Sequence, residues 1–129
     1  MCNEFHQESK YNPRKIKPSG TAWKVFEERD GVLLGAYSLC NYTEGPNGFI
    51  VWNEKCTEYT TNPKLRGFCA FPLKSDAQET AKELDNVLNN LNLVIKRVHY
   101  KQGIGRITTN EVDGRLHDII IIKQFKVLD

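Results

Sequence analysis

The sequence has no apolar run that could cross a bilayer. Even the four consecutive isoleucines at 119–122 fall far short of the roughly 20 apolar residues that a membrane-spanning helix needs. Residues 1–6 likewise lack the continuous apolar segment of a secretory signal. We therefore expect no membrane partner and a cytoplasmic location, where thiols stay reduced.

Cysteine is scarce, and its spacing carries no motif. The chain has four cysteines, and no two of them form a Cys-x-x-Cys pair. The sequence therefore offers neither a zinc-finger spacing nor a redox motif, and we predict no metal site and no cofactor. Spacing alone leaves disulfides open, but buried free thiols are the simpler interpretation.

The net charge is small, because the chain has 18 Lys and Arg against 16 Asp and Glu, a difference of +2. The excess lies within residues 1–20, where four cations stand against Glu4 and Glu8: Lys10, Arg14, Lys15 and Lys17. This stretch has prolines and no apolar periodicity, so we predict a basic N-terminal arm over 1–20, extended or flexible, before a single domain over 21–129.

The arm has three possible uses. It can track a phosphate backbone, dock onto an acidic protein surface, or simply keep the chain in solution. An excess of two positive charges is small beside that of a dedicated nucleic-acid binder, so nucleic acid is the less favoured partner.

An aromatic strand followed by a capped helix is the strongest local pattern. Residues 67–71 read Gly-Phe-Cys-Ala-Phe, stop at a proline, and lead to Ser75 and Gln78, which have the spacing of a capping box. Apolar residues then recur at steps of three and four, at Ala77, Ala81, Leu84, Leu88 and Leu91. The pattern predicts one main helix over about 75–91, with a stripe that a sheet must cover.

Most of the remaining pattern is typical of strands. A strand at 22–28 leads through Asp30-Gly31, a two-residue hairpin turn, into residues 32–34. After the helix we expect a strand at 93–101, a turn between Gly103 and Gly105, and a continuation at 106–109. Shorter strands are expected at 49–52 and 56–59.

The last strand is expected at 117–127, after a second hairpin turn at Asp113-Gly114. Its four isoleucines point to both faces, as in a central strand that is covered on both sides. The fold class is therefore α+β, a mostly antiparallel twisted sheet with one main helix packed on it.

A row of basic side chains is the first candidate site. Arg97, His99 and Lys101 alternate with Val98 and Tyr100, so they share one face of a strand at spacings of roughly 6.6 Å. With Arg106 or Arg115 expected nearby on adjacent strands, the row can bind a carboxylate or a phosphate. The alternative is the solvated outer face of a half-buried sheet.

Two tyrosines form the second candidate site. Tyr37 and Tyr42 flank a segment with little alternation, which suggests a loop that presents both rings to a partner or a planar ligand, although core packing is the simpler alternative. Possible nucleophiles and acid–base groups are scattered, at Cys69, His99, Glu111, His117 and Asp118, and nothing in the sequence brings them together. No catalytic residue is therefore predicted.

Several short motifs follow one another in order: Trp-Lys-Val-Phe at 23–26, Gly-Phe-Cys-Ala-Phe at 67–71, Ser-Asp-Ala at 75–77, Val-Ile-Lys-Arg-Val at 94–98, and the isoleucine strand. This order, over about residues 20–125, resembles a loose family of small proteins encoded by phages and mobile elements. Such proteins often carry Gly-Phe-His-x-Phe before the helix, and Cys69 stands here in place of that histidine. The resemblance implies an accessory protein that binds host components.

Three functions of different classes remain open. The favoured one is a non-enzymatic protein that binds a host protein, in its sharpest form as a counter-defence inhibitor, or a small anionic ligand. The second is a small nucleotide-handling or ADP-ribosyltransferase-like enzyme that uses His99, Tyr100 and Glu111. The third is a structural or assembly protein.

Overall fold

A computed structural model describes residues 14–35, 45, 47–52, 67–88, 91–110 and 116–128. The described elements are β1 (Ser19–Arg29), β2 (Val32–Gly35), β3 (Ile50–Val51), β4 (Phe68–Ala70), α1 (Lys74–Leu88), β5 (Leu93–Asn110) and β6 (Leu116–Val127). The strands form one six-stranded antiparallel sheet in the order β2-β1-β5-β6-β3, with β4 also paired to β6. The α+β class is confirmed. The predicted strand at 56–59 lies outside the described residues.

The first hairpin forms as its turn residues predict. Asp30 and Gly31 have φ values of 52° and 78°, the left-handed conformations that a two-residue hairpin turn requires. β1 and β2 pair on either side of this turn, from Arg29 opposite Val32 to Phe26 opposite Gly35. The local sequence alone therefore sets the register of this edge.

β5 is one continuous strand of 18 residues, not two strands joined by a turn. The predicted turn between Gly103 and Gly105 is wrong, because the register with β6 shifts there by a bulge and the pairing continues on both sides. Gln102 has a φ of 54° next to this bulge. Glycines mark turns and bulges alike, so the local pattern could not separate the two.

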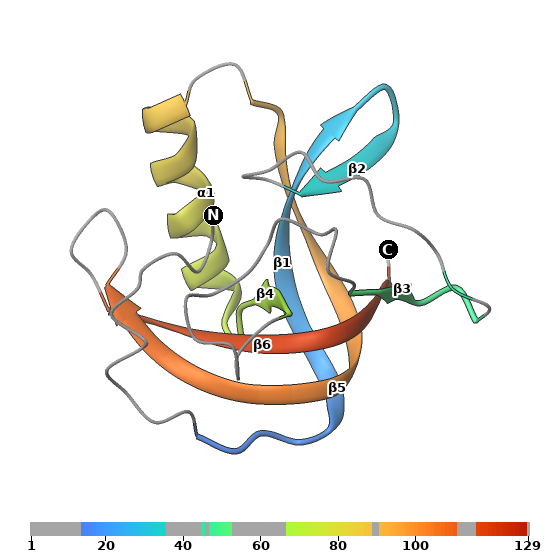
Figure 1. Cartoon of the computed structure of the whole chain (residues 1–129). Coiled ribbons are helices and arrows are strands. Elements are labelled where there is room, and N and C mark those ends of the chain that lie inside the picture. The colour runs from blue at the N-terminus through green and yellow to red at the C-terminus, as the bar shows by residue number, and fades with distance from the viewer. Residues whose placement is uncertain are drawn as a thin grey trace.

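β5 and β6 bend together through a wide arc, and α1 lies above this arc (Figure 1). β6 is internal to the sheet, because it pairs with β5 on one edge and with β3 and β4 on the other. The backbone of residues 111–115, with the predicted turn at 113–114, lies outside the described residues. The central position predicted for the last strand is confirmed.

The curled sheet closes on itself beyond β4. The residue after β4, Phe71, exchanges two backbone hydrogen bonds with Trp23 of β1, at 2.8 and 2.7 Å. Since β4 also pairs with β6, hydrogen bonds run from β1 through β5, β6 and β4 back to β1. No local pattern predicts this closure, because the pairs that complete it join residues far apart in the chain.

The helix α1 begins at Lys74, one residue earlier than predicted, and ends at Leu88. The carbonyl of Leu73 accepts the N–H of Ala77, so Ser75 lies in the first turn and not at the cap. The predicted stripe does face the sheet, since Ala77 and Leu84 are buried. The apolar face predicted from the sequence is therefore the face that packs against the sheet.

Two hydrophobic clusters lie on opposite faces of the sheet. The helix-face cluster contains Val25, Cys69, Phe71, Ala77, Leu84, Ile107, Ile119 and Ile121. The second-face cluster contains Ala22, Phe26, Phe68, Ala70, Val98, Tyr100, Ile120, Ile122 and Phe125. The four isoleucines of β6 thus alternate between the two clusters, as predicted.

The described part of the N-terminal arm lies along β5 and continues the line of β1. Arg14 and Arg106 exchange two backbone hydrogen bonds of 2.9 Å, and the Gly103 N–H donates to the carbonyl of Pro18. Ile16 packs against the second-face cluster. Residues 14–18 are therefore extended and docked, while residues 1–13 lie outside the described part of the chain.

Gly67 occupies a position that has no room for a side chain. A Cβ added there would lie 2.6 Å from the carbonyl oxygen of Ile122 and 2.9 Å from Cγ2 of Ile121. We expect Gly67→Ala to lower the free energy of unfolding in urea by about 1–3 kcal/mol, because β4 must move away from β6. Gln78→Ala, on the exposed side of α1, is the control and should change it by less than about 0.5 kcal/mol. Equal effects of the two changes would contradict the packing described for β4.

Candidate functional site

A basic surface on β5 brings the predicted row together and adds a fourth residue. Val98 and Tyr100 belong to the second-face cluster, so Arg97, His99 and Lys101 point to the opposite face. Lys126 of β6 lies directly opposite His99 and therefore shares that face. We call Arg97, His99, Lys101 and Lys126 the β5 basic face.

The apolar residues that precede the row explain where the basic face begins. Leu93 and Ile95 lie on the same side of β5 and pack against the helix-face cluster. From Arg97 onward the same alternate positions carry cationic or titratable side chains. The change from apolar to basic side chains marks the point where this face of β5 no longer packs against the helix-face cluster.

Phe49, just before β3, holds two members of the basic face in place. Its ring meets the His99 ring edge-on at a centroid distance of 5.6 Å, and Lys101 Nζ lies 4.2 Å from the Phe49 centroid. Phe49 itself is only 9% exposed. The contacts limit the freedom of Lys101 and His99, whereas Arg97 is exposed and bonds to Thr21 Oγ1 at 3.5 Å.

Within the described strands, the cross-strand neighbours of the basic face carry no carboxylate. Ser19 and Gln124 flank Lys101, while Thr21 flanks His99 on the side away from Lys126. In this part of the sheet, the positive charges of Lys101 and Lys126 therefore have no carboxylate directly opposite them among the residues paired in the described strands.

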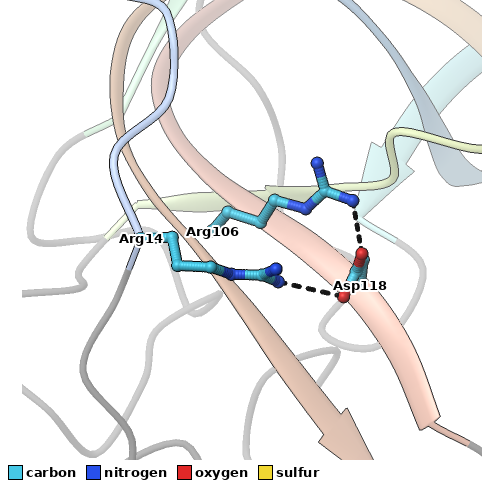
Figure 2. A network of polar contacts seen from close by, with 3 residues as sticks. All are labelled: Arg14, Arg106 and Asp118. Atoms are coloured by element: carbon cyan, nitrogen blue, oxygen red, sulfur yellow. Dashed lines mark hydrogen bonds and ion pairs between the residues drawn. The ribbon is translucent and has the colours of Figure 1, made fainter.

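A second cationic cluster lies at the other end of β5, where Arg14 and Arg106 both bind Asp118 (Figure 2). Arg14 Nη2 donates to Oδ1 of Asp118 at 3.2 Å, and Arg106 Nη2 donates to Oδ2. Arg106 lies opposite Ile120 of the second-face cluster, so it does not join the β5 basic face. The prediction that Arg106 lies on a strand adjacent to the row is wrong, because β5 continues through it as one strand. Arg115, the alternative, lies outside the described residues.

The remaining predicted residues divide into two groups. Lys15 and Lys17 of the arm are exposed. Lys10, Tyr37 and Tyr42 lie outside the described residues, so the tyrosine loop stays a prediction.

Residues considered for catalysis do not converge in the described part of the chain. His99 lies on the β5 basic face, whereas Tyr100 belongs to the second-face cluster, and Glu111 lies outside the described residues. The thiol of Cys69 is buried, since the residue is only 2% exposed. A thiol at this position lacks the access that a nucleophile needs.

Lys24 is an amine buried among aromatic rings, a feature that the sequence did not predict. It is 2% exposed, and its Nζ donates to the carbonyl of Cys69 at 3.0 Å. The same Nζ lies 5.6 to 5.7 Å from the centroids of three rings, those of Phe26, Phe68 and Phe125. These contacts compensate for the loss of water around the charge and tie β1 to β4.

Sequence reasoning missed Lys126 and Phe49 as members of a site, and it gave Asp118 no partner. Each of these residues reaches its neighbours from a different strand or loop, so no spacing along the chain reveals the contact. Only the register between β5 and β6 places Lys126 opposite His99.

No protein-family model matches the chain, and neither a curated protein nor a solved structure is similar enough to count as a match. The resemblance to small phage proteins therefore stays a prediction. In the described residues there is no group of three or more His, Cys, Asp or Glu side chains that could hold a metal ion. No helix in the same part of the chain is long and apolar enough to span a membrane.

Burial of Tyr100 links the stability of the fold to pH. Desolvation raises the pKa of the Tyr100 hydroxyl above its ordinary value. The unfolded state therefore releases this proton first, above about pH 10, and folding stability falls as pH rises from there towards the folded pKa. We expect the free energy of unfolding in urea to fall less between about pH 9 and pH 11 for Tyr100→Phe than for the parent protein. Identical pH profiles for the two proteins would contradict this assignment.

Proposed function

We propose that the chain is a non-enzymatic binding protein that captures an acidic segment of a partner protein on the β5 basic face. One observation carries the proposal: three permanent cations and a histidine lie on one sheet face, and their cross-strand neighbours Ser19, Thr21 and Gln124 carry no charge. A surface of this kind attracts a partner of opposite charge and speeds its association.

The spacing of the basic face suits an extended peptide. Alternate residues of a strand lie about 6.6 to 6.8 Å apart, and an extended partner presents its own alternate side chains at the same interval. Carboxylates at every second position of such a segment can therefore meet Arg97, His99 and Lys101 in turn. Arg97 uses one long bond to Thr21, which leaves most of its planar donor fork for a carboxylate.

The aromatic residue at this surface favours a protein partner over a single-stranded nucleic acid. Proteins that bind single strands stack bases on accessible aromatic rings. Phe49 is nearly buried and is already occupied by His99 and Lys101, so it offers no free ring face of that kind. Without base stacking, only the attraction between positive side chains and phosphates supports nucleic-acid binding at this surface.

The resemblance to phage proteins supplies a biological context for this proposal. The partner is then a host protein in the host cytoplasm, and the chain acts by occupying a surface and not by turnover. A counter-defence inhibitor is the sharpest form of this idea. The enzyme and assembly alternatives stay predictions that no contact in the described residues favours.

We expect the double change Arg97→Glu and Lys101→Glu to weaken binding of a labelled peptide of alternating Glu and Thr by about tenfold or more, measured by fluorescence anisotropy. Each reversal replaces an attraction with a repulsion on the same surface. Binding by the parent should also weaken as salt is raised from about 0.05 M to about 0.5 M.

Lys82→Glu on α1 is the matched control, because it reverses one exposed charge away from the β5 basic face. The proposal fails if this control loses as much affinity as the double variant. A single-stranded oligonucleotide of equal charge serves as competitor. If the oligonucleotide binds more tightly than the peptide, the partner class is nucleic acid and the proposal is overturned.

A further inference from the structure

The β5 basic face is closed at one end and open at the other. Next to Arg97, on the same side of β5, Ile95 packs against the helix-face cluster, which includes the buried side of α1. α1 lies beside this first part of β5 (Figure 1). At the other end, past Lys101, the side-chain hydrogen bond from Gln124 to Gln102 is exposed. An extended segment on this face can therefore enter past Lys101, but α1 stands in its way beyond Arg97.

Apolar side chains flank Arg97 at this closed end. Trp23 of β1 lies directly opposite Arg97 on one edge, and on the other edge the Leu128 N–H donates to the Arg97 carbonyl at 2.9 Å, which continues the register of β5 with β6. Opposite residues share a sheet face, so the three side chains stand in one row across the sheet. Lys74, the first residue of α1, places its Nζ 5.1 Å from the Trp23 ring centroid. Apolar neighbours strengthen a charged hydrogen bond, because they lower the local dielectric constant.

Arg97 is the member of the β5 basic face that is best suited to a carboxylate. Its side chain is exposed, and its Nη2 donates to Thr21 Oγ1 over a long distance of 3.5 Å. A guanidinium is planar, and its paired N–H donors match the two oxygens of one carboxylate. Lys101 binds as a point charge instead, and its Nζ lies 4.2 Å from the Phe49 ring centroid. The strongest carboxylate contact therefore falls at the closed end of the face.

We propose that the acidic segment bound on the β5 basic face is the C-terminal tail of a partner chain, with its terminal carboxylate on the Arg97 guanidinium. A chain that ends at Arg97 needs no room beyond it, whereas an internal segment must turn away from the sheet before Ile95. The positive charge of the face would repel a terminal amine, so the end is the carboxyl one. This inference rests on the proposed function, because it specifies which part of the partner the same face takes.

Strand spacing sets how such a tail lies on the face. Alternate positions of an extended chain are about 6.6 to 6.8 Å apart. Acidic residues at the second-last and fourth-last positions of the tail can therefore face His99 and Lys101. The terminal carboxylate then falls close to where the next sheet-facing side chain would be, within reach of the long Arg97 side chain. The tail thus runs antiparallel to β5.

The test compares three labelled peptides of alternating Glu and Thr, by fluorescence anisotropy with the full chain. The first ends in threonine with a free carboxylate. The second is amidated and has one additional glutamate at its labelled end, so its net charge equals that of the first. The third has the same additional glutamate and continues past the last threonine with three neutral residues and an amide. We expect the first peptide to bind about fivefold to tenfold more tightly than either of the others.

Three single variants locate the terminal carboxylate on the face. Arg97→Gln should reduce the preference for the free carboxylate to within about twofold, because the planar fork is lost. Lys101→Gln removes one cation from the same face, so it should weaken all three peptides and keep the preference. Lys82→Gln removes one exposed charge on α1 and should change neither the affinities nor the preference. If Lys101→Gln abolishes the preference as fully as Arg97→Gln does, the assignment to Arg97 is overturned.

The outcomes separate this inference from the proposed function. Equal binding of all three peptides by the parent, with loss of binding in the Arg97→Glu and Lys101→Glu double variant, would keep the proposed function and overturn the C-terminal assignment. Binding of the extended peptide as tightly as the free acid would show that the face continues past Arg97, and would overturn the assignment as well. If none of the peptides binds, the proposed function fails and this inference fails with it.

Discussion

The pairing of β5 on both of its edges is the constraint on which the other features of the structure depend. β1 and the arm occupy one edge of this strand, and β6 occupies the other. The bulge between Gly103 and Gly105 lets the strand bend without losing either neighbour. Of the candidate residues that the structure describes, Arg97, His99, Lys101 and Arg106 lie on β5, and Lys126 and Asp118 lie on β6, which is bonded to β5.

Alternation along β5 separates the two cationic surfaces. Arg97, His99 and Lys101 share one face, while Arg106 lies with the second-face cluster on the other. The two surfaces also differ in their balance of charge, because the β5 basic face has neutral cross-strand neighbours whereas the arginine pair shares Asp118.

Local patterns predicted the elements well, because their signals lie within a few residues of each other. The hairpin at Asp30-Gly31, the apolar stripe of α1 and the two-sided isoleucines of β6 all appear as expected. The same local logic failed at Gly103, where a bulge and a turn have similar composition. It also misplaced the start of α1, since Leu73 and not Ser75 receives the first helical bond.

The candidate site was less predictable than the fold, for a physical reason. The row on β5 follows from alternation within one strand, but its completion by Lys126 and Phe49 depends on pairing between segments far apart in sequence. The contact of Arg14 and Arg106 with Asp118 likewise joins three segments that no spacing rule connects. Strand register is a tertiary property, and it decides which charged residues become neighbours.

Amide hydrogen exchange at Gly103 and Arg106 tests the central claim most directly, because both N–H groups bond to the arm. Gly103 donates to the carbonyl of Pro18 at 3.1 Å, and Arg106 donates to that of Arg14 at 2.9 Å. The account predicts that both amides exchange at least about 100-fold more slowly than in the unfolded chain. Exchange of both at the unfolded rate, while the part of β5 paired with β1 stays protected, would show that the arm does not lie along β5.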